Sequence, residues 1–399
     1  MSAPAEPRST VAPPALDVQS LREREFPHVG RAPYLNAASI GPLPERARLA
    51  VEAYNRRRSA VHELRGDDFD PTLARARRAA ARLVGAHEDE IALLPNTSYG
   101  LNLAAHALPL RPGQRIVVSD REFPANVYPW MRLREAEGVR LDLVPTDAQG
   151  RPDEERLLAE LDRGDVGLFA LSAVQFASGW SADLARFGRA CRERGAWFVV
   201  DAIQAVGCLP VDVRAAQVDV LATGAHKWLC SPFGTGFAYV RRELVERLQP
   251  GVVGWTAFTA TADLARLLDY RYELGDTARR FEVATPAFQD YAGMTQALEL
   301  IAEVGVETIR AHVFSLLDPF AAWLRDEEVA EVTSDLSPAH RSGIFAFRPR
   351  DPAAAFRALR GAGVACVLRE GSIRLSPHLY NTHDDLGRVM DVLARREGW

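Results

Sequence analysis

Lys227 and Asp201 are the two strongest candidates for catalytic residues in this sequence. Asp201 ends the apolar run WFVVD, and Lys227 follows the apolar run VDVLATG, 26 positions later. Lys227 is the only lysine among the 48 lysine and arginine residues of the chain. A general exchange of lysine for arginine explains the missing lysines, but it does not explain the one that remains. Arginine stays protonated in proteins, whereas a buried lysine can lose its proton and attack a carbonyl carbon to form a Schiff base.

The surroundings of Lys227 favour that chemistry over the alternative, a lysine left by chance on a solvated face. Its neighbours His226, Trp228 and Leu229 are not typical of such a face. Asp201, as a carboxylate at the end of an apolar strand, needs a partner. That partner is either an ordinary salt bridge or cap, or the cationic nitrogen of a heterocycle.

Four groups required by pyridoxal 5′-phosphate (PLP) are present. The cofactor needs a lysine, an acid for its ring nitrogen, a phosphate cradle and an apolar group against the ring. The segment IALLPNTSYGLNLAAHAL passes from an apolar run into a helix, whose free N–H groups and dipole attract anions. Alone, this segment equally indicates N-capping by Thr97 or Ser98, and Phe123 alone indicates a core residue. Together they predict PLP held by Lys227, Asp201, Thr97, Ser98 and Phe123.

The elements around these residues predict an α/β fold. Apolar strands expected at 115–120, 139–145, 166–176, 196–202, 218–224 and 234–240 alternate with amphipathic helices over much of this stretch. Such strands favour a mostly parallel sheet covered by helices on both faces, with function at the carboxyl ends of the strands. Segment 120–123, Gln175, Asp201 and segment 223–227 all lie at such ends.

Three segments divide the chain. Residues 1–33 begin with a stretch rich in Pro, Ala and Ser, which predicts a mobile N-terminal arm. Residues 34–290 are expected to form a large PLP-binding domain. Residues 291–399 are expected to form a smaller α+β domain, closed by a helix with a capping box from Thr382 and Asp385.

Composition excludes several classes of function. The net charge of −5 gives no basic footprint for nucleic acid, and no apolar run has the length of a membrane span. The N-terminus does not resemble a secretory signal, and the four cysteines are too dispersed for a disulfide framework or a zinc site. We therefore expect a cytoplasmic protein without a metal. The sequence also lacks the glycine motif of nicotinamide enzymes after a strand and the G-x-S-x-G motif of serine hydrolases.

Several motifs, in order, resemble the aminotransferase class V family of fold-type I PLP enzymes. VVDAIQAVG, TGAHKWLCSPFGTGFAYV, PNTSYGLN and REFPANVYPW carry this resemblance. The family includes cysteine desulfurases, selenocysteine lyase, kynureninase and isopenicillin N epimerase. The resemblance implies that Lys227 forms the Schiff base and that Gln204 lies near the phenolic oxygen of the cofactor. It also implies that Thr223 and His226 lie near the phosphate.

Two C-terminal motifs extend the resemblance to a partner subunit and to a substrate carboxylate. RRFEVATP resembles a segment whose threonine, here Thr285, reaches the phosphate of the neighbouring subunit, which implies a homodimer with shared sites. Trp255 in GVVGW either lines the partner's site or is plain interface. SIRLSPHLYNTHDDL resembles a segment whose arginine, here Arg374, clamps a substrate carboxylate in a bidentate pair. Asn36 either helps to hold that carboxylate or caps a turn.

The departures from the family pattern reduce the number of reactions to be expected. Desulfurases place a histidine at the position of Phe123, and they carry a nucleophilic cysteine on a loop before the arginine segment. Here VACVLREGSIR leaves little loop, and Cys366 lies inside an apolar run. A cysteine desulfurase is therefore disfavoured, and Phe123 with Pro124 is nearer to the kynureninase and epimerase branch.

We expect a PLP-dependent enzyme that acts on a small amino acid through an α-carbanion, as a transaminase or a C–S lyase. Activity like that of isopenicillin N epimerase or kynureninase is the alternative. A PLP-binding regulatory module without catalysis is a hypothesis of a different class. The intact Lys227, Asp201 and Arg374 speak against that module.

Overall fold

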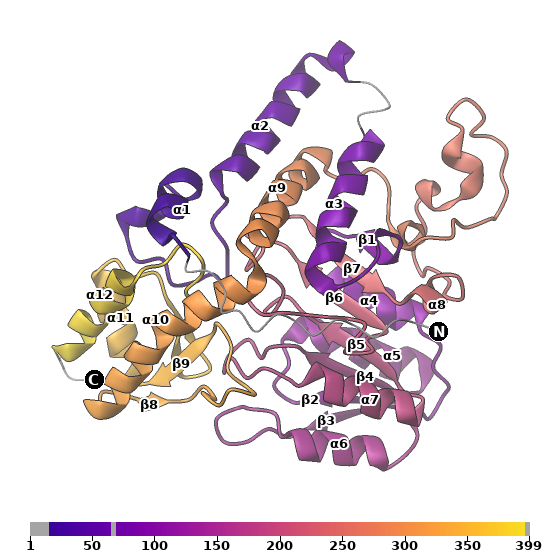
Figure 1. Cartoon of the computed structure of the whole chain (residues 1–399). Helices are drawn as coiled ribbons and strands as arrows, with labels where there is room; N and C mark the ends of the chain where they lie inside the picture. The colour runs from indigo at the N-terminus through magenta and orange to yellow at the C-terminus, as the bar shows by residue number, and fades with distance from the viewer. Residues whose placement is uncertain (1–15, 65–68, 396–399) are drawn as a thin grey trace, which may run out of the picture.

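A seven-stranded sheet forms the centre of the protein, and the computed structural model describes residues 16–64 and 69–395 (Figure 1). The strand order is β1-β7-β6-β5-β4-β2-β3, and β7 alone runs antiparallel to its neighbours. This confirms the predicted mostly parallel sheet. The strands are β1 (Ile91–Leu93), β2 (Arg115–Ser119), β3 (Arg140–Val144), β4 (Val166–Ser172), β5 (Trp197–Asp201), β6 (Val220–Gly224) and β7 (Gly236–Val240).

Helices cover both faces of this sheet because its inner strands are apolar on both sides. Phe169, Leu171 and Phe198 pack in one cluster, whereas Leu168 and Val199, their neighbours along the strands, pack in another. The first face is covered by α3 (Phe69–Val84), α6 (Glu154–Asp162) and α7 (Leu184–Arg194). The second face is covered by α4 (Thr97–Ala107), α5 (Tyr128–Glu137) and α8 (Arg242–Val245).

A second, antiparallel sheet lies in the C-terminal part of the chain, in the order β10-β11-β9-β8. The capping box of Thr382 and Asp385 at its last helix is present, as predicted. The division at residue 290 stays a prediction. The elements are α9 (Phe288–Val304), α10 (Val306–Asp326), β8 (Glu331–Val332), β9 (Phe345–Arg348), α11 (Pro352–Gly361), β10 (Val367–Arg369), β11 (Ser372–Leu375) and α12 (His383–Ala394).

The N-terminal segment packs against this C-terminal part. Residues 18–25 form α1 (Val18–Glu25), Leu21 and Phe26 are buried, and the Phe26 ring lies 5.0 Å from the ring of Tyr380. Part of the predicted arm therefore packs on the C-terminal part, residues 1–15 lie outside the described residues, and the mobility of the arm stays a prediction. Helix α2 (Glu45–Ser59) then packs on α9.

Short 3₁₀ turns link the larger elements. They are η1 (Val29–Arg31), η2 (Val61–Glu63), η4 (Glu88–Glu90), η5 (Pro124–Asn126), η6 (Trp255–Ala257), η7 (Thr259–Ala262) and η8 (Ala278–Phe281). In the part of the chain that the structure describes, no helix has the length and apolar character needed to cross a membrane.

Segment 34–41 links the small C-terminal sheet to the loop that carries Lys227. Its amides donate to backbone oxygens of the small sheet, from Leu35 to Ala365 (3.0 Å) and from Ala37 to Ser376 (3.1 Å). At its end, Gly41 N donates to His226 O over 2.8 Å. A side chain at Gly41 would meet the Lys227 carbonyl oxygen at 2.0 Å, so only glycine fits this crossing. This segment fixes the position of the Lys227 loop relative to β11.

Candidate active site

The predicted residues meet at the carboxyl ends of the central strands. Asp201 is the last residue of β5 and pairs in register with Ala222 of the neighbouring strand β6. Lys227 lies in the loop that follows β6, and its Nζ lies 5.5 Å from the centroid of the Phe123 ring. The sheet therefore brings together three side chains that are far apart in sequence.

The amine of Lys227 is poised to lose its proton. Burial, helped by the charges of Arg374 and Arg369, lowers its pKa to about 8 against the attraction of Asp201. A lysine in this state provides a free amine near neutral pH, as nucleophilic and proton-transfer chemistry requires.

Asp201 has the environment expected for a partner of a cationic ring nitrogen. Its side chain is buried, and one carboxylate oxygen accepts from the amide of Ile203 over 3.0 Å. Burial raises its pKa to about 6. Within the described residues it has no ion pair shorter than 4 Å. A positively charged ring N–H beside it would supply the missing partner and lower its pKa again.

The N-terminus of α4 faces the end of β6. The hydroxyl of Thr97, the first residue of the helix, accepts from the amide of Gly224 over 2.8 Å. The capping side chain is Asn96, which accepts from the amide of Tyr99, so neither Thr97 nor Ser98 is the cap. The first-turn amides of Thr97 and Ser98 have no intrahelical acceptor and remain free for an anion.

Two further residues expected near a phosphate flank this helix end. The Thr223 hydroxyl donates to the backbone oxygen of Gly224 (3.2 Å). Burial, followed by the charge of Lys227, lowers the pKa of His226, so its imidazole is neutral and retains one N–H donor. Thr223 lies in β6, and His226 precedes Lys227 in the loop that follows this strand.

Phe123 presents its ring to an open space. It is 42% exposed, which is unusual for an aromatic side chain next to buried strands, and it makes an edge contact with Phe176. The ring centroids of these two residues lie 5.3 Å apart. An exposed ring beside the amine of Lys227 is suited to stack on a flat cofactor.

Arg374 is a buried guanidinium that has no carboxylate partner in the part of the chain that the structure describes. It is 2% exposed, and it donates to the backbone oxygen of Phe176 (2.5 Å) and to the hydroxyl of Ser39 (2.8 Å). Its Nε is buried and has no hydrogen-bond partner. Burial lowers its pKa to about 10. Because a buried cation needs a counterion, this arrangement fits the binding of a substrate carboxylate.

The side chains of Asn36 and Gln204 differ in how many hydrogen bonds they make within the protein. The Asn36 Oδ1 is buried without a partner, and it is the backbone oxygen of Asn36, not its side chain, that accepts the turn amides of Ser39 and Ile40. The Gln204 amide is tied into the protein, since it donates to Ala38 O (3.0 Å) and accepts from Trp228 Nε1 (2.8 Å). One Gln204 N–H remains for a cofactor oxygen.

Thr285 and Trp255 lie on the outside of the single chain. Trp255 is 49% exposed, Thr285 is also exposed, and an added Cβ at Gly254 would lie 2.9 Å from Val283 Cα, so the two loops pack against each other. The preceding Glu282 is anchored by a buried ion pair with Arg77 (2.6 Å). The structure of one chain does not bring these two residues to Lys227.

Glu122 is a site residue to which the sequence assigned no role. Its buried carboxylate accepts from the amide of Ser172 (2.9 Å), from the Ser172 hydroxyl, from Gln175 (2.8 Å) and from Asn126 (3.0 Å). Burial raises its pKa to about 7, and the nearby charge of Asp201 adds to this effect. The sequence could have indicated this residue, because Glu122 is an acid that precedes Phe123 at the end of a strand.

Comparison with known proteins decides the family. Residues 34–389 match the family described as aminotransferase class-V. The chain belongs to the class-V aminotransferases.

Its relatives carry different names. The chain is 29% identical to the uncharacterized aminotransferase YcbU of Bacillus subtilis, over 80% of this chain and 83% of that protein. It is 29% identical to a probable cysteine desulfurase of Methanothermobacter thermautotrophicus, over 93% and 97% of the two chains. It is 28% identical to the isopenicillin N epimerase of Streptomyces clavuligerus, over 91% and 94%.

Solved structures agree on the fold. The apo cysteine desulfurase of Thermococcus onnurineus superimposes with a TM-score of 0.86 at 22% identity, covering 96% of this chain and 99% of that one. The cystine C-S lyase C-DES superimposes with a TM-score of 0.84 at 23% identity, covering 93% and 99%. These likenesses establish a fold-type I architecture for this class-V enzyme.

The residues of this class-V enzyme fit its cofactor, PLP. The free first-turn amides of α4 suit the phosphate, Asp201 without a counterion suits the ring nitrogen, and the exposed Phe123 suits the ring face. Lys227 suits the covalent link. PLP would provide the partner that these groups lack within the described residues: an anion for the amides, a cation for Asp201 and a flat ring for Phe123.

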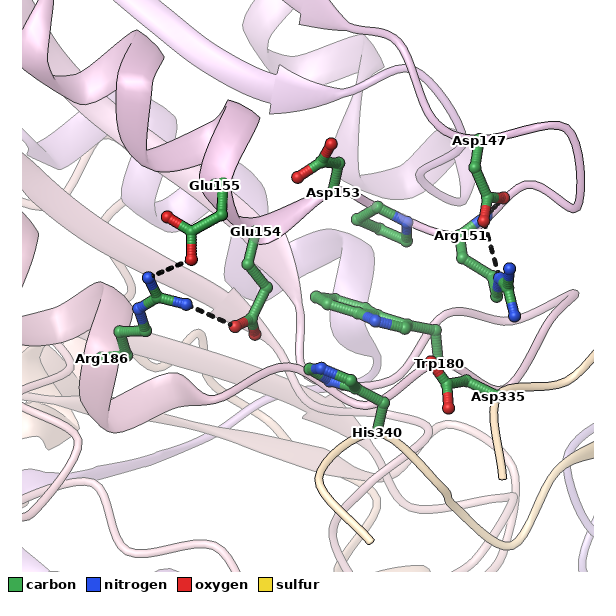
Figure 2. A pocket seen from close by; sticks show the side chains of 10 residues that line it. Asp147, Arg151, Asp153, Glu154, Glu155, Trp180, Arg186, Asp335 and His340 are labelled. Atoms are coloured by element: carbon green, nitrogen blue, oxygen red, sulfur yellow. Dashed lines mark hydrogen bonds and ion pairs between the residues drawn. The ribbon is translucent and has the colours of Figure 1, made fainter. Parts of the chain in front are cut away.

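A separate cavity of about 320 Å³ lies at the junction of α6 with the segment 335–340 (Figure 2). Figure 2 shows that Arg186 reaches Glu154 and Glu155, and that Arg151 reaches Asp147. Both arginines that line the cavity are thus already paired with acids. None of the residues predicted for catalysis lines this cavity, so it is not the active site.

Proposed function

We propose that this class-V enzyme acts on an α-amino acid as a transaminase or a C–S lyase, with Lys227 as covalent anchor and proton carrier. The observation that carries the proposal is the position of the only lysine. Its amine is next to Asp201, Arg374 and the face of Phe123, with a pKa of about 8. A lysine retained for structure alone has no need of a lowered pKa or of an exposed aromatic partner.

Each residue has a separate task in this proposal. PLP, when bound, withdraws electrons from the α-carbon of the substrate. Arg374 holds the α-carboxylate through N–H groups that its two protein contacts leave free, which orients the Cα–H bond. The Lys227 amine accepts the α-proton and returns it. Asp201 keeps a proton on the ring nitrogen, since its buried carboxylate makes no ion pair within the described residues.

The cysteines support a reaction other than desulfuration. All four cysteines, Cys191, Cys208, Cys230 and Cys366, are free and buried. Burial raises the pKa of the Cys366 thiol to about 12, and the β10–β11 hairpin after it turns within two residues. Since the thiolate is the reactive form, no cysteine of this chain is suited to accept sulfur from a substrate.

The exposed loops support a homodimer with shared sites. Val252, Val253, Leu268 and Tyr270 are exposed together with Trp255 in the loop before Thr285. Exposed apolar groups of this kind mark an interaction surface. In the proposed dimer, Thr285 donates to the phosphate bound by the other subunit, and Trp255 lies near its entrance.

The experiment is a product screen of the holoenzyme over alanine, cysteine, cystine, kynurenine and larger amino acids. A keto acid with aminated cofactor indicates transamination, and pyruvate with a sulfur product indicates C–S cleavage. Loss of optical activity without a product indicates the epimerase alternative, and anthranilate indicates the kynureninase alternative. If PLP binds but no amino acid changes its spectrum or is converted, the chain is a binding module and the proposal fails. K227A must abolish every activity found.

A further inference from the structure

Arg369 and Arg374 lie on the same face of one β-hairpin. In the β10–β11 ladder, Arg369 is paired with Ser372, and Arg374 is paired with Val367. Residues that face each other across a ladder share a face, and side chains alternate along each strand. Ile373, on the other face, is completely buried in the core. The two arginines are diagonal neighbours, with a backbone separation of about 7–8 Å.

This face is directed at the active site. Arg374 reaches Phe176 and Ser39, and the charges of both arginines act on Lys227. The hairpin turn is next to the segment of Phe123, because Glu370 pairs with Arg121 at 3.5 Å. Arg369 is exposed at this turn. One arginine is therefore at the floor of the site and the other is at its mouth.

Neither arginine has an acidic partner within the described residues, although most arginines of this protein do. Arg348, on the same face of the same sheet, is paired with Glu331 at 3.5 Å. Like charges that are close on one sheet face repel each other. Arg369 and Arg374 therefore provide two positive charges, and each can bind one anionic group.

We propose that the substrate is an amino acid with a second anionic group in its side chain, whose α-carboxylate binds Arg374 and whose distal anion binds Arg369. The inference rests on the proposed function, and it names the substrate class of the same site. A second carboxylate is the simplest such group. An amide of the same shape is neutral and cannot replace it, because it has no charge for the Arg369 guanidinium.

The test compares isosteric pairs, aspartate with asparagine and glutamate with glutamine, as substrates of the holoenzyme, its R369Q variant and the matched control R348Q. We expect the wild type to prefer the acid of each pair. R369Q should raise KM for the acids by about tenfold, as for loss of a charged hydrogen bond, and leave KM for the amides unchanged. Any change in kcat that follows from the loss of its charge near Lys227 should be the same for acids and amides. R348Q should behave as the wild type.

A binding measurement makes the result independent of turnover. Calorimetric titration with glutarate and with butyrate should give about tenfold weaker glutarate binding in R369Q and unchanged butyrate binding. An unchanged glutarate affinity, or equal losses for acid and amide, overturns the inference while leaving the proposed function intact. Failure of the wild type to bind PLP would instead overturn the proposed function. An unchanged thermal midpoint of R369Q confirms that this exposed substitution leaves the fold intact.

Discussion

The amine of Lys227 should titrate far below an ordinary lysine in the protein without cofactor. Burial and the charges of Arg374 and Arg369 lower its pKa from 10.5 to about 8. At about 1.4 kcal/mol per pKa unit, this shift corresponds to roughly 3 kcal/mol of preference for the neutral amine. At pH 7.5 about a quarter of the molecules have a free amine, against roughly one in a thousand for an unperturbed lysine.

The assay uses the fact that the chain has one lysine. Lys227 and the N-terminal amine are the only amines that a small acylating reagent can modify, and peptide mass spectrometry separates the two products from each other and from any modified thiol or phenol. The rate at Lys227 should rise through a midpoint near pH 8. R374Q, which removes one of the charges, should move that midpoint upwards. A midpoint near 10.5, or one that R374Q does not move, would refute the electrostatic reasoning.

The same pKa shift has a consequence for stability. Unfolded lysine keeps its proton up to about pH 10.5, whereas folded Lys227 releases it near pH 8. Between these values the unfolded state binds more protons, so the free energy of unfolding rises with pH. Below pH 8 the folded protein buries a charged amine, which lowers its free energy of unfolding. K227M should remove this pH dependence, which denaturant titrations of the cofactor-free protein at pH 7.5 and 10 can measure.

Three further predictions concern other contacts. G41A should destabilise the protein by about 2 kcal/mol or more and weaken PLP binding, because its Cβ would meet the Lys227 carbonyl oxygen at 2.0 Å. The control is G361A, whose Cβ would have nothing within 4 Å, and it should be neutral in both denaturation and PLP titration. E122Q should lower stability by about 1–3 kcal/mol, because its amide would place donors against donors of Ser172 and Asn126; an unchanged denaturation midpoint would contradict that network. At limiting PLP, mixing the inactive K227A with T285V should recover about a quarter of wild-type activity, because half of the dimers carry one intact shared site. No recovery after confirmed subunit exchange would place Thr285 in its own subunit's site.

Local patterns predicted the elements and the convergence of the site. Leu73, Ala76, Ala80 and Leu83 have helical spacing, and all four are buried in α3. Asp201 and Lys227 each follow an apolar strand, and parallel strands place their carboxyl ends at one edge of a sheet. These inferences need only periodicity and the rules of sheet packing, so they were available without coordinates.

Other features depend on contacts that local patterns do not encode. Helix α1 is mostly polar, and it is held by the burial of Leu21 and Phe26 against distant residues. The two-residue strand β8 is too short for any alternation to be read. The contact of Ser39 with Arg374 joins residues 335 positions apart. The shared face of Arg369 and Arg374 follows from the hairpin register, which a one-residue slip would reverse.

The most direct test of the central claim is borohydride reduction of the protein loaded with PLP, followed by peptide mass spectrometry. We expect a visible absorbance band that disappears on reduction and one peptide carrying the reduced cofactor, with Lys227 as the modified residue. K227R should show neither the band nor the modification. A protein that binds PLP without such a band, or a modification found only at the N-terminal amine, would contradict the account.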